Sequence, residues 1–298
     1  QLKAFKGQAV ILPERPAQLF DSKHDRLLSR TRAACYDRRI MPQPSLSIVI
    51  PTLNAAAQLP GCLATLREAG RQWPDRLELL VVDGGSDDGT KALAAAAGAA
   101  LLDSAPGRGV QLARGAREAR GKWLLFLHAD SRLEAGWSGA VAAWMAQARP
   151  RDQAAYFTLR FDSRAPAARR LERLVRWRND RFQLPYGDQG LLITRRLYRR
   201  VGGYGAEPLM EDVALVRRLR RAPPQPNPRA NPRAIPQQDA SSGRVLVRLP
   251  VAVTTSAARY EREGWLWRAL RNLTLLLLYF LGLPPRRLVG FYAARNKG

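Results

Sequence analysis

Short apolar runs alternate with stretches of helical periodicity between residues 46 and 127. Runs of Leu, Ile, Val and Ala predict buried strands at 46–50, 77–82, 99–102 and 123–127. Apolar positions three or four residues apart, and an alanine run that stops at a glycine, predict helices at 59–66, 89–98 and 111–120. Strands that alternate with helices and lack hairpin turns predict an α/β fold, with helices flanking a doubly wound, mostly parallel sheet.

The alternation weakens beyond Gly136, although helical and extended patterns continue. The same criteria predict helices at 140–148, 167–181 and 211–221, and strands at 155–161, 190–196 and 244–256. Polar and apolar residues alternate at 155–161, so we expect this strand to be more exposed than the others.

Differences in composition suggest the domain organisation. Residues 1–43 are polar and aperiodic, which predicts an extension before a folded domain at 44–260. Residues 222–243 are rich in Pro and Asn, which disfavours helix and central strand and predicts a disordered surface loop. The chain ends in a basic, amphipathic helical segment at 261–298, with its main helix predicted from Arg262 to Phe280.

Basic residues outnumber acidic ones, with 49 Lys and Arg against 25 Asp and Glu in 298 residues and a formal net charge of +24. This excess predicts anionic partners such as phosphates or an anionic membrane surface, although a solvated basic face would give the same composition. The aromatic residues are not interleaved with basic ones as in a nucleic-acid-binding module, so we expect no specific nucleic acid.

The C-terminal segment is the candidate for a membrane contact. Its longest apolar stretch, 273–283, is short for a spanning helix and ends at Pro284. Basic and aromatic residues surround this stretch, namely Arg259, Arg262, Trp265, Trp267, Arg268 and Arg271. An interfacial helix and a helix packed on the domain both fit this pattern. The N-terminal residues show no signal-peptide pattern, and we expect a cytoplasmic protein with peripheral membrane contact as an option.

Short polar side chains follow three of the predicted strands. In an open parallel sheet, ligands bind beyond the carboxyl ends of the strands. The candidates at these ends are Pro51, Thr52, Asn54, Asp83, Gly84, His128 and Asp130. Three of them have a structural alternative, since an Asp such as Asp83 can cap a helix, Asn54 can occupy a turn and His128 can be part of a core. With two His and two Cys in the chain, a zinc site is disfavoured, and a carboxylate such as Asp130 would favour Mg²⁺ or Mn²⁺.

Three further motifs carry polar residues in loops or at a helix start. "PGRGVQLARGA" supplies Arg108 and Gln111; it departs from a dinucleotide fingerprint because Leu112 occupies the third glycine position. A flexible glycine-rich loop with an Arg suits anionic phosphates. "PYGDQG" supplies Asp188 and Gln189. "PLMEDVAL" supplies Glu211 and Asp212, although acids also favour the first turn of a helix for electrostatic reasons.

The motifs together resemble those of family 2 glycosyltransferases of the GT-A fold. "SIVIPTLN", "LLVVDGGSDDGT", "GRGVQLARGA", "LLFLHADS", "PYGDQG" and "LMEDVALVRRLRR" occur in the order typical of that family, from about Ser45 to Tyr292. The set is most similar to a bacterial subgroup described as radical-SAM-associated glycosyltransferases, connected with arsenosugar biosynthesis.

The resemblance implies an inverting transferase that uses a nucleotide-sugar donor, with an unknown acceptor. It implies that Asp83 contacts the base or ribose of the donor, that Asp130 holds the divalent metal, and that Asp212 is the catalytic base. The other implied donor-nucleotide residues are Pro51, Thr52, Asn54, Gly84, Arg108, Gln111 and His128. The implied acceptor or sugar residues are Asp188, Gln189 and Glu211.

Two residues depart from the family pattern. Ala55 stands where many relatives carry an acid, and His128 stands where the first acid of the Asp-x-Asp motif is expected. A histidine can bind a phosphate, a ribose or Mn²⁺. The alternative function is a nucleotidyltransferase on a similar sheet; such enzymes usually carry a glycine-rich loop after the first strand, where this chain reads "PTLNAAAQL".

Overall fold

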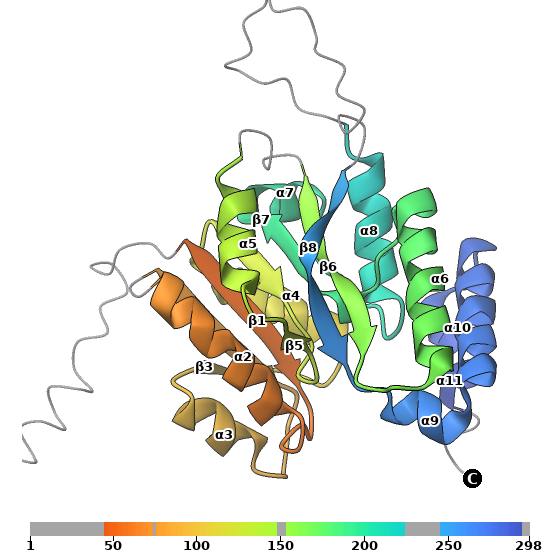
Figure 1. Cartoon of the computed structure of the whole chain (residues 1–298), viewed down its shortest axis with the longest axis horizontal. Helices are drawn as coiled ribbons and strands as arrows, with labels where there is room; N and C mark the ends of the chain where they lie inside the picture. Colours follow the sequence, from red (N-terminus) through yellow and green to blue (C-terminus); the bar gives the residue numbers. More distant parts are fainter. Residues whose placement is uncertain (1–44, 74–75, 148–152, 224–244, 294–298) are drawn as a thin grey trace, which may run out of the picture. The chain divides into compact units, whose positions relative to one another are not determined.

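The strands form one sheet in the computed structural model, which describes residues 45–73, 76–147, 153–223 and 245–293 (Figure 1). Within these residues the strand order is β3-β2-β1-β4-β7-β6-β8-β5. The strands are β1 (Leu46–Thr52), β2 (Leu77–Asp83), β3 (Ala100–Asp103), β4 (Trp123–Phe126), β5 (Arg132–Leu133), β6 (Ala154–Phe161), β7 (Leu191–Thr194) and β8 (Leu246–Thr255). The extension predicted at 1–43 and nearly all of the loop predicted at 222–243 lie outside the described residues.

The sheet is mostly parallel, as the alternating pattern predicts. β3, β2, β1 and β4 pair in parallel, and so do β6 and β8. β7 is antiparallel to both β4 and β6, and β5 is antiparallel to β8. Because β7 reverses direction between β4 and β6, the carboxyl ends of β1, β4, β6 and β8 all reach the same edge of the sheet. This edge is where a ligand site is expected.

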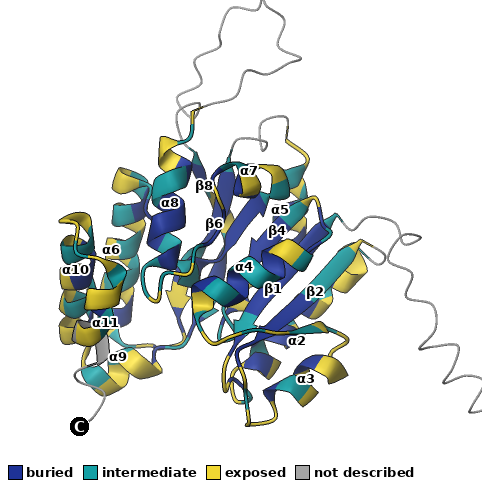
Figure 2. Cartoon of the chain, turned by 180° about the vertical axis from the view of Figure 1, so that it is seen from behind, coloured by how far each residue is buried: buried dark blue, intermediate teal, exposed yellow. Residues whose placement is uncertain are grey.

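Helices cover both faces of the sheet, which confirms the doubly wound architecture (Figure 1). The helices are α2 (Leu59–Gln72), α3 (Thr90–Ala96), α4 (Arg108–Glu118), α5 (Trp137–Met145), α6 (Pro166–Phe182), α7 (Arg195–Arg200), α8 (Glu211–Arg221), α9 (Ala258–Glu263), α10 (Trp265–Phe280) and α11 (Pro285–Ala293). α4, α7 and α8 share one core with Val49 and Val82, whereas α2, α3 and α5 share the other with Ile48 and Val81. The inner strands β1, β4 and β7 are buried on both sides, which explains why they are almost wholly apolar, whereas the edge strand β3 is partly exposed (Figure 2).

Two expectations from the sequence are wrong. The strand predicted to be more exposed, at 155–161, is β6, which is almost wholly buried because it lies between β7 and β8 inside the sheet. The helix predicted from Arg262 to Phe280 is two helices, α9 and α10, because Gly264 between them adopts a φ of 87°. A residue in that left-handed region ends the helical hydrogen-bond ladder, and glycine enters it without steric cost.

Gly115 lets α4 approach the sheet closely, and its replacement gives a test of this packing. A Cβ at position 115 would collide with Val49 and lie 2.9 Å from Val82 Cγ2. We expect Gly115→Ala to lower the free energy of unfolding by about 1–3 kcal/mol, the usual cost of overpacking a core. Urea denaturation measures the change.

The matched control for Gly115→Ala is Gly139→Ala in α5, where a Cβ would have no atom within 4 Å. There the better helix propensity of alanine should raise stability, by up to about 1 kcal/mol. Equal stability of the two variants would contradict a close approach of α4 to β1 and β2.

Candidate functional site

A cavity of ≈ 850 Å³ opens at the sheet edge where the parallel strands end. β1 contributes Pro51 to its lining, the segment after β4 contributes His128 and Asp130, and β6 and β8 contribute Phe161 and Thr255. The cavity therefore lies where open α/β sheets bind their ligands.

The structure brings most of the predicted site residues to this cavity but not all of them. Those that line it are Pro51, Asn54, Arg108, Gln111, His128, Asp130, Asp188 and Asp212. Those outside its lining are Thr52, Asp83, Gly84, Gln189 and Glu211. Four of these five have buried side chains engaged in hydrogen bonds or an ion pair, and the fifth is a buried glycine. These five residues therefore lie beneath the cavity lining and support the residues that form it.

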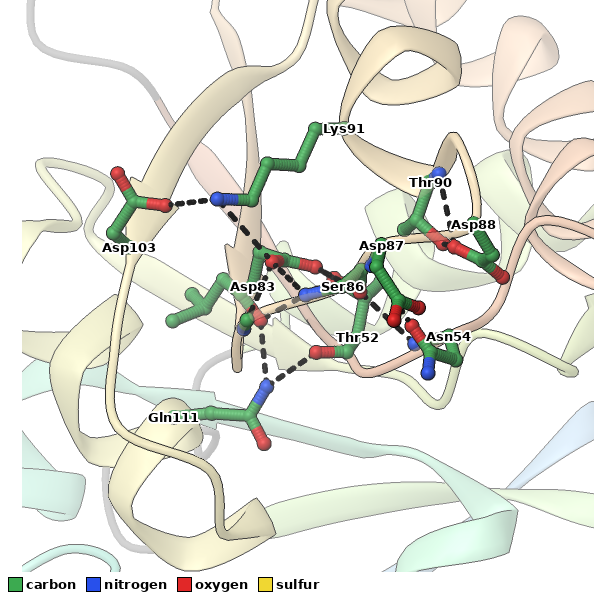
Figure 3. Close-up of polar contacts among 12 residues, drawn as sticks. Thr52, Asn54, Asp83, Ser86, Asp87, Asp88, Thr90, Lys91, Asp103 and Gln111 are labelled. Carbon is green, nitrogen blue, oxygen red and sulfur yellow. Dashed lines mark hydrogen bonds and ion pairs between the residues drawn. The ribbon is translucent and has the colours of Figure 1, made fainter.

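Asp83 organises the loop that follows β2 (Figure 3). Its Oδ1 accepts hydrogen bonds from the hydroxyl groups of Thr52 and Ser86, and its Oδ2 accepts from the N–H groups of Gly85 and Ser86, at 3.0 and 2.8 Å. Burial by itself raises the pKa of Asp83, but these hydrogen bonds, led by those from Ser86, outweigh it and lower the pKa. The buried carboxylate is therefore ionised and holds the loop in place.

The loops after β1 and β2 are joined by hydrogen bonds (Figure 3). Asn54 accepts from the N–H of Asp87 at 3.1 Å and donates its own N–H to Ser86 Oγ at 2.9 Å. Asn54 has a φ of 48°, a turn conformation that Asn tolerates better than most residues. Asp88 accepts from the N–H groups of Ala56 and Thr90, so it stabilises the start of α3.

The buried side chain of Gln111 connects the carboxyl ends of β1 and β2 by hydrogen bonds. Its Nε2 donates to the carbonyl oxygens of Thr52 and Val82, at 2.7 and 2.8 Å, and the side chain is buried. A Cβ at Gly84 would lie 3.1 Å from that Nε2, so position 84 has little room for a side chain. Gln111 is part of the cavity lining, but its amide nitrogen already donates hydrogen bonds to two backbone carbonyl oxygens.

His128 is a neutral imidazole on the cavity lining. Burial, and then the nearby positive charges of Arg108 and Arg259, lower its pKa well below the usual value of 6.5. A neutral imidazole keeps one nitrogen lone pair, so it can accept a hydrogen bond or bind a metal ion.

Asp130 is the carboxylate that best fits a divalent cation. Its Oδ2 accepts a hydrogen bond from the Thr255 hydroxyl group at 3.2 Å, and its side chain lines the cavity. Within the described residues, no group of three or more His, Cys, Asp or Glu is arranged to hold a metal ion. Among these residues, Asp130 could therefore hold a cation only together with other ligands, such as the oxygen atoms of a bound substrate.

Gly187 lies where His128 and Asp212 approach each other. Its N–H donates to Asp212 Oδ2 at 2.7 Å. A Cβ at position 187 would lie 3.0 Å from His128 Nε2 and 3.3 Å from Asp212 Oδ2. A side chain at position 187 would press against both groups, so glycine here leaves them room to approach each other.

Asp188 carries a carboxylate oxygen without a partner. Its Oδ1 is buried and has no hydrogen-bond partner among the described residues. Burial raises the pKa of Asp188 to about 6; Arg178 opposes the rise, and the negative charges of Asp212 and Asp130 add to it. A buried polar atom without a partner is costly, so this oxygen is suited to accept a hydrogen bond from a ligand.

Gln189 and Glu211 support the site from inside the protein. Gln189 is buried; its Oε1 accepts from Asn179 Nδ2 at 2.9 Å, and its Nε2 donates to the Phe157 carbonyl oxygen at 3.1 Å. Glu211 is buried and pairs with Arg108 at 3.2 Å, while burial and then Asp212 raise its pKa. Neither side chain faces the cavity, so both position neighbouring residues.

The C-terminal helices complete the cavity, which the sequence does not reveal. α9 and α10 contribute Arg259, Tyr260, Arg262, Arg268 and Asn272 to its lining. The sequence pattern marks these arginines only as flanks of an apolar helix. Their place at the site depends on how α9 packs after β8, and Phe161, Tyr260 and Trp265 form that contact through ring pairs with centroids 5.1–5.4 Å apart.

The raised pKa of Asp188 predicts a pH-dependent stability. Its pKa of about 6 lies above the ordinary 3.8, so its contribution to stability is present below pH 3.8 and is lost as the pH rises through about 6. Asp188→Asn removes the charge, and we expect it to raise the melting temperature at pH 7.5 by roughly 2–4 °C. Scanning calorimetry should show no such gain at pH 3.5.

The matched control for Asp188→Asn is Asp180→Asn, which alters a surface ion pair with Arg248. That variant should change the melting temperature little at either pH. A gain for Asp188→Asn that is equal at both pH values would contradict the buried, uncompensated carboxylate.

Comparisons with known proteins agree with this fold. Residues 47–201, more than half of the chain, match the sequence model described as "Glycosyl transferase family 2". A PGL/p-HBAD biosynthesis glycosyltransferase of Mycobacterium tuberculosis is 42% identical over 120 residues, which cover 38% of this chain and 46% of that protein. The chain therefore spans less than half the length of this curated relative.

Two solved structures are similar in fold at low sequence identity. Glucosyl-3-phosphoglycerate synthase from Mycobacterium tuberculosis, in complex with Mn²⁺, uridine diphosphate and phosphoglyceric acid, has a TM-score of 0.51 and 18% identity, covering 81% of this chain and 80% of that one. A mannosyltransferase from Pyrobaculum calidifontis, in complex with GDP-Man and Mn²⁺, has a TM-score of 0.51 and 20% identity, covering 77% of this chain and 63% of that one. Both support the GT-A type of α/β fold.

Proposed function

The chain belongs to glycosyl transferase family 2, and from this premise we propose that it moves a sugar from a nucleoside-diphosphate sugar to a hydroxyl group of an acceptor. One observation carries the proposal: a single cavity at the carboxyl ends of the parallel strands holds Asp130, His128 and Asp212 together. This arrangement provides a carboxylate for a cation at the donor diphosphate and another for a proton, both on the lining of one cavity.

The donor nucleotide would occupy the part of the cavity formed by the first two strand ends. Asn54 and Pro51 line it there, and Asp83 holds the adjoining loop. Arg108 lies at the start of α4 on the same lining, where a guanidinium group and the helix N-terminus both favour phosphate oxygens. Contact of Asp83 with the base or ribose would require its hydrogen bonds to Ser86 to rearrange.

The transfer step would be a single displacement. The acceptor oxygen attacks the anomeric carbon, the bond from that carbon to the diphosphate oxygen breaks, and the nucleoside diphosphate leaves with the electron pair. Asp212 Oδ2 would take the proton from the acceptor hydroxyl group, and the Gly187 N–H holds this oxygen in position. One displacement at the anomeric carbon inverts its configuration.

Asp130 would hold Mg²⁺ or Mn²⁺ against the donor diphosphate, with His128 as a neutral neighbour. Such a cation, when bound, offsets the negative charge of the leaving diphosphate. The solved complexes with Mn²⁺ and a nucleotide support this choice of cofactor and of donor class. Asp188, with its unpartnered carboxylate oxygen, would accept a hydrogen bond from the transferred sugar or the acceptor.

The finer assignment is to the radical-SAM-associated subgroup connected with arsenosugar biosynthesis. It is supported by the "HAD" and "YGDQG" motifs, whose residues His128, Asp130, Gly187 and Asp188 lie around one cavity. The acceptor hydroxyl group would enter beside α9 and α10, since these helices contribute a part of the lining that is separate in sequence from the first strand ends.

A thermal-shift screen tests the proposal. We expect one nucleoside-diphosphate sugar to raise the melting temperature of the full chain with Mn²⁺ present and to raise it less without the ion, because a bound donor stabilises the folded state by mass action. A second assay mixes nucleoside triphosphates with sugar phosphates. Release of pyrophosphate there, with no response to any nucleotide sugar, would overturn the proposal in favour of a nucleotidyltransferase.

A further inference from the structure

α10 exposes a stripe of large apolar side chains. Leu266, Leu270, Leu273, Leu277 and Phe280 follow one another at intervals of four and three residues, so they lie on one face of the helix. These side chains are between 43% and 74% exposed. The opposite face packs inward, with Arg268, Leu275 and Leu276 buried. Soluble proteins rarely leave such a continuous apolar face open to water.

Large apolar side chains are exposed near this stripe as well. α6, which contacts α10, exposes Leu174, Trp177 and Phe182, and Trp267 of α10 is exposed as well. α6, α10 and α11 lie side by side at the end of the domain away from α3 (Figures 1 and 2). Tryptophan together with leucine suits the interface between water and lipid, because the indole ring is apolar with one polar edge.

The charge around the stripe is positive. Exposed arginines on the adjoining helices are Arg170, Arg173, Arg176 and Arg181 on α6, Arg262 on α9, and Arg286 and Arg287 on α11. α10 and α11 contain no Asp or Glu. Glu263, just before α10, already pairs with Arg268 and Arg271 at 2.7 and 2.6 Å. The helices next to the stripe thus carry an excess of exposed positive charge, with Glu261 on α9 as an exposed acid among them.

We propose that the α10 stripe and its arginines bind the surface of an anionic lipid bilayer, with the stripe inserted among the headgroups. Within the described residues no helix combines the length and apolar character needed to cross a bilayer, so the contact would be peripheral. A second copy of the chain is a poorer occupant, since its arginines would face these ones. Residues 1–43 also carry more Lys and Arg than Asp and Glu, which disfavours them as a cover.

Bilayer binding would also orient the cavity. Arg268 and Asn272 line the cavity from the side of α10 that faces away from the stripe. The cavity would therefore lie about one helix diameter, ~10 Å, from the headgroups. The proposal of bilayer binding does not depend on the proposed transfer reaction, because lipid binding can be measured without donor or acceptor.

Vesicle co-flotation of the full chain tests the proposal. We expect binding to vesicles of phosphatidylglycerol and phosphatidylcholine, weaker binding to pure phosphatidylcholine, and a loss of binding when salt is raised, since salt screens the arginines. Leu273→Glu should weaken binding to the anionic vesicles by at least about tenfold, because it removes an inserted side chain and adds a repelled charge.

Leu93→Glu is the matched control, since Leu93 is an exposed leucine on α3 at the far end of the sheet. It changes the net charge equally and should bind vesicles as the unmodified chain does. Equal weakening by both variants, no binding by the unmodified chain, or self-association that Leu273→Glu abolishes would each overturn the proposal. The thermal shift with a nucleotide sugar should be the same in both variants, so failure of one proposal does not imply failure of the other.

Discussion

Replacement of Asp212 by Asn is expected to lower the rate of glycosyl transfer by about 10²–10⁴-fold, the usual contribution of a positioned general base. The amide keeps the size of the carboxylate, and its oxygen can still accept the Gly187 N–H that now reaches Asp212 Oδ2 at 2.7 Å. What it loses is the ability to take a proton from the acceptor. Transfer is measured by release of the nucleoside diphosphate with donor and acceptor at saturating concentrations.

The same variant should bind the donor normally, which separates a loss of chemistry from a loss of the site. The melting-temperature shift caused by the donor and Mn²⁺ should therefore equal that of the unmodified chain. Asp180→Asn, an equal change at a surface ion pair, serves as control and should retain full activity. Full transfer activity of Asp212→Asn would remove this residue from the role of base.

Replacement of Asp130 by Asn is expected to weaken metal-dependent donor binding by at least about tenfold, since a neutral amide is a poorer ligand for a hard cation than a carboxylate. The amide can keep the hydrogen bond with the Thr255 hydroxyl group, now 3.2 Å long, so the local structure should persist. Calorimetric titration with the nucleoside diphosphate, with and without Mn²⁺, measures the effect. Without the ion, the unmodified and variant chains should bind with similar affinity.

Asp103→Asn provides the control for Asp130→Asn. Asp103 is the last residue of the parallel strand β3, but it is exposed, pairs with Lys91 at 2.8 Å, and lies outside the cavity lining. Its replacement should leave the Mn²⁺ effect unchanged. An undiminished Mn²⁺ effect in Asp130→Asn would show that another group holds the cation.

The order of strands and helices was predictable because it depends on local patterns. Runs such as 46–50 and 77–82 are apolar at all positions but one, Ser47 in the first and Glu78 in the second, as expected of strands in the interior of a parallel sheet. The strand ends that carry Asn54, His128 and Asp130 were predictable as well, because parallel strands bring their carboxyl ends to one edge. The burial of β6 was not predictable, because its alternating pattern gave no sign that it lies between two other strands.

The sequence by itself determined the fold class, the family and the strand ends that form the site, because these depend on periodicity and on motifs of neighbouring residues. Only the tertiary structure decided which polar side chains face the cavity. Asp83 and Gln189 turn inward to hydrogen bonds from the loop and from α6, whereas Asp212 meets Gly187 from a distant segment. It also decided that α10 has one face toward the cavity and one toward solvent. Both outcomes depend on the packing of segments far apart in the chain, which periodicity does not encode.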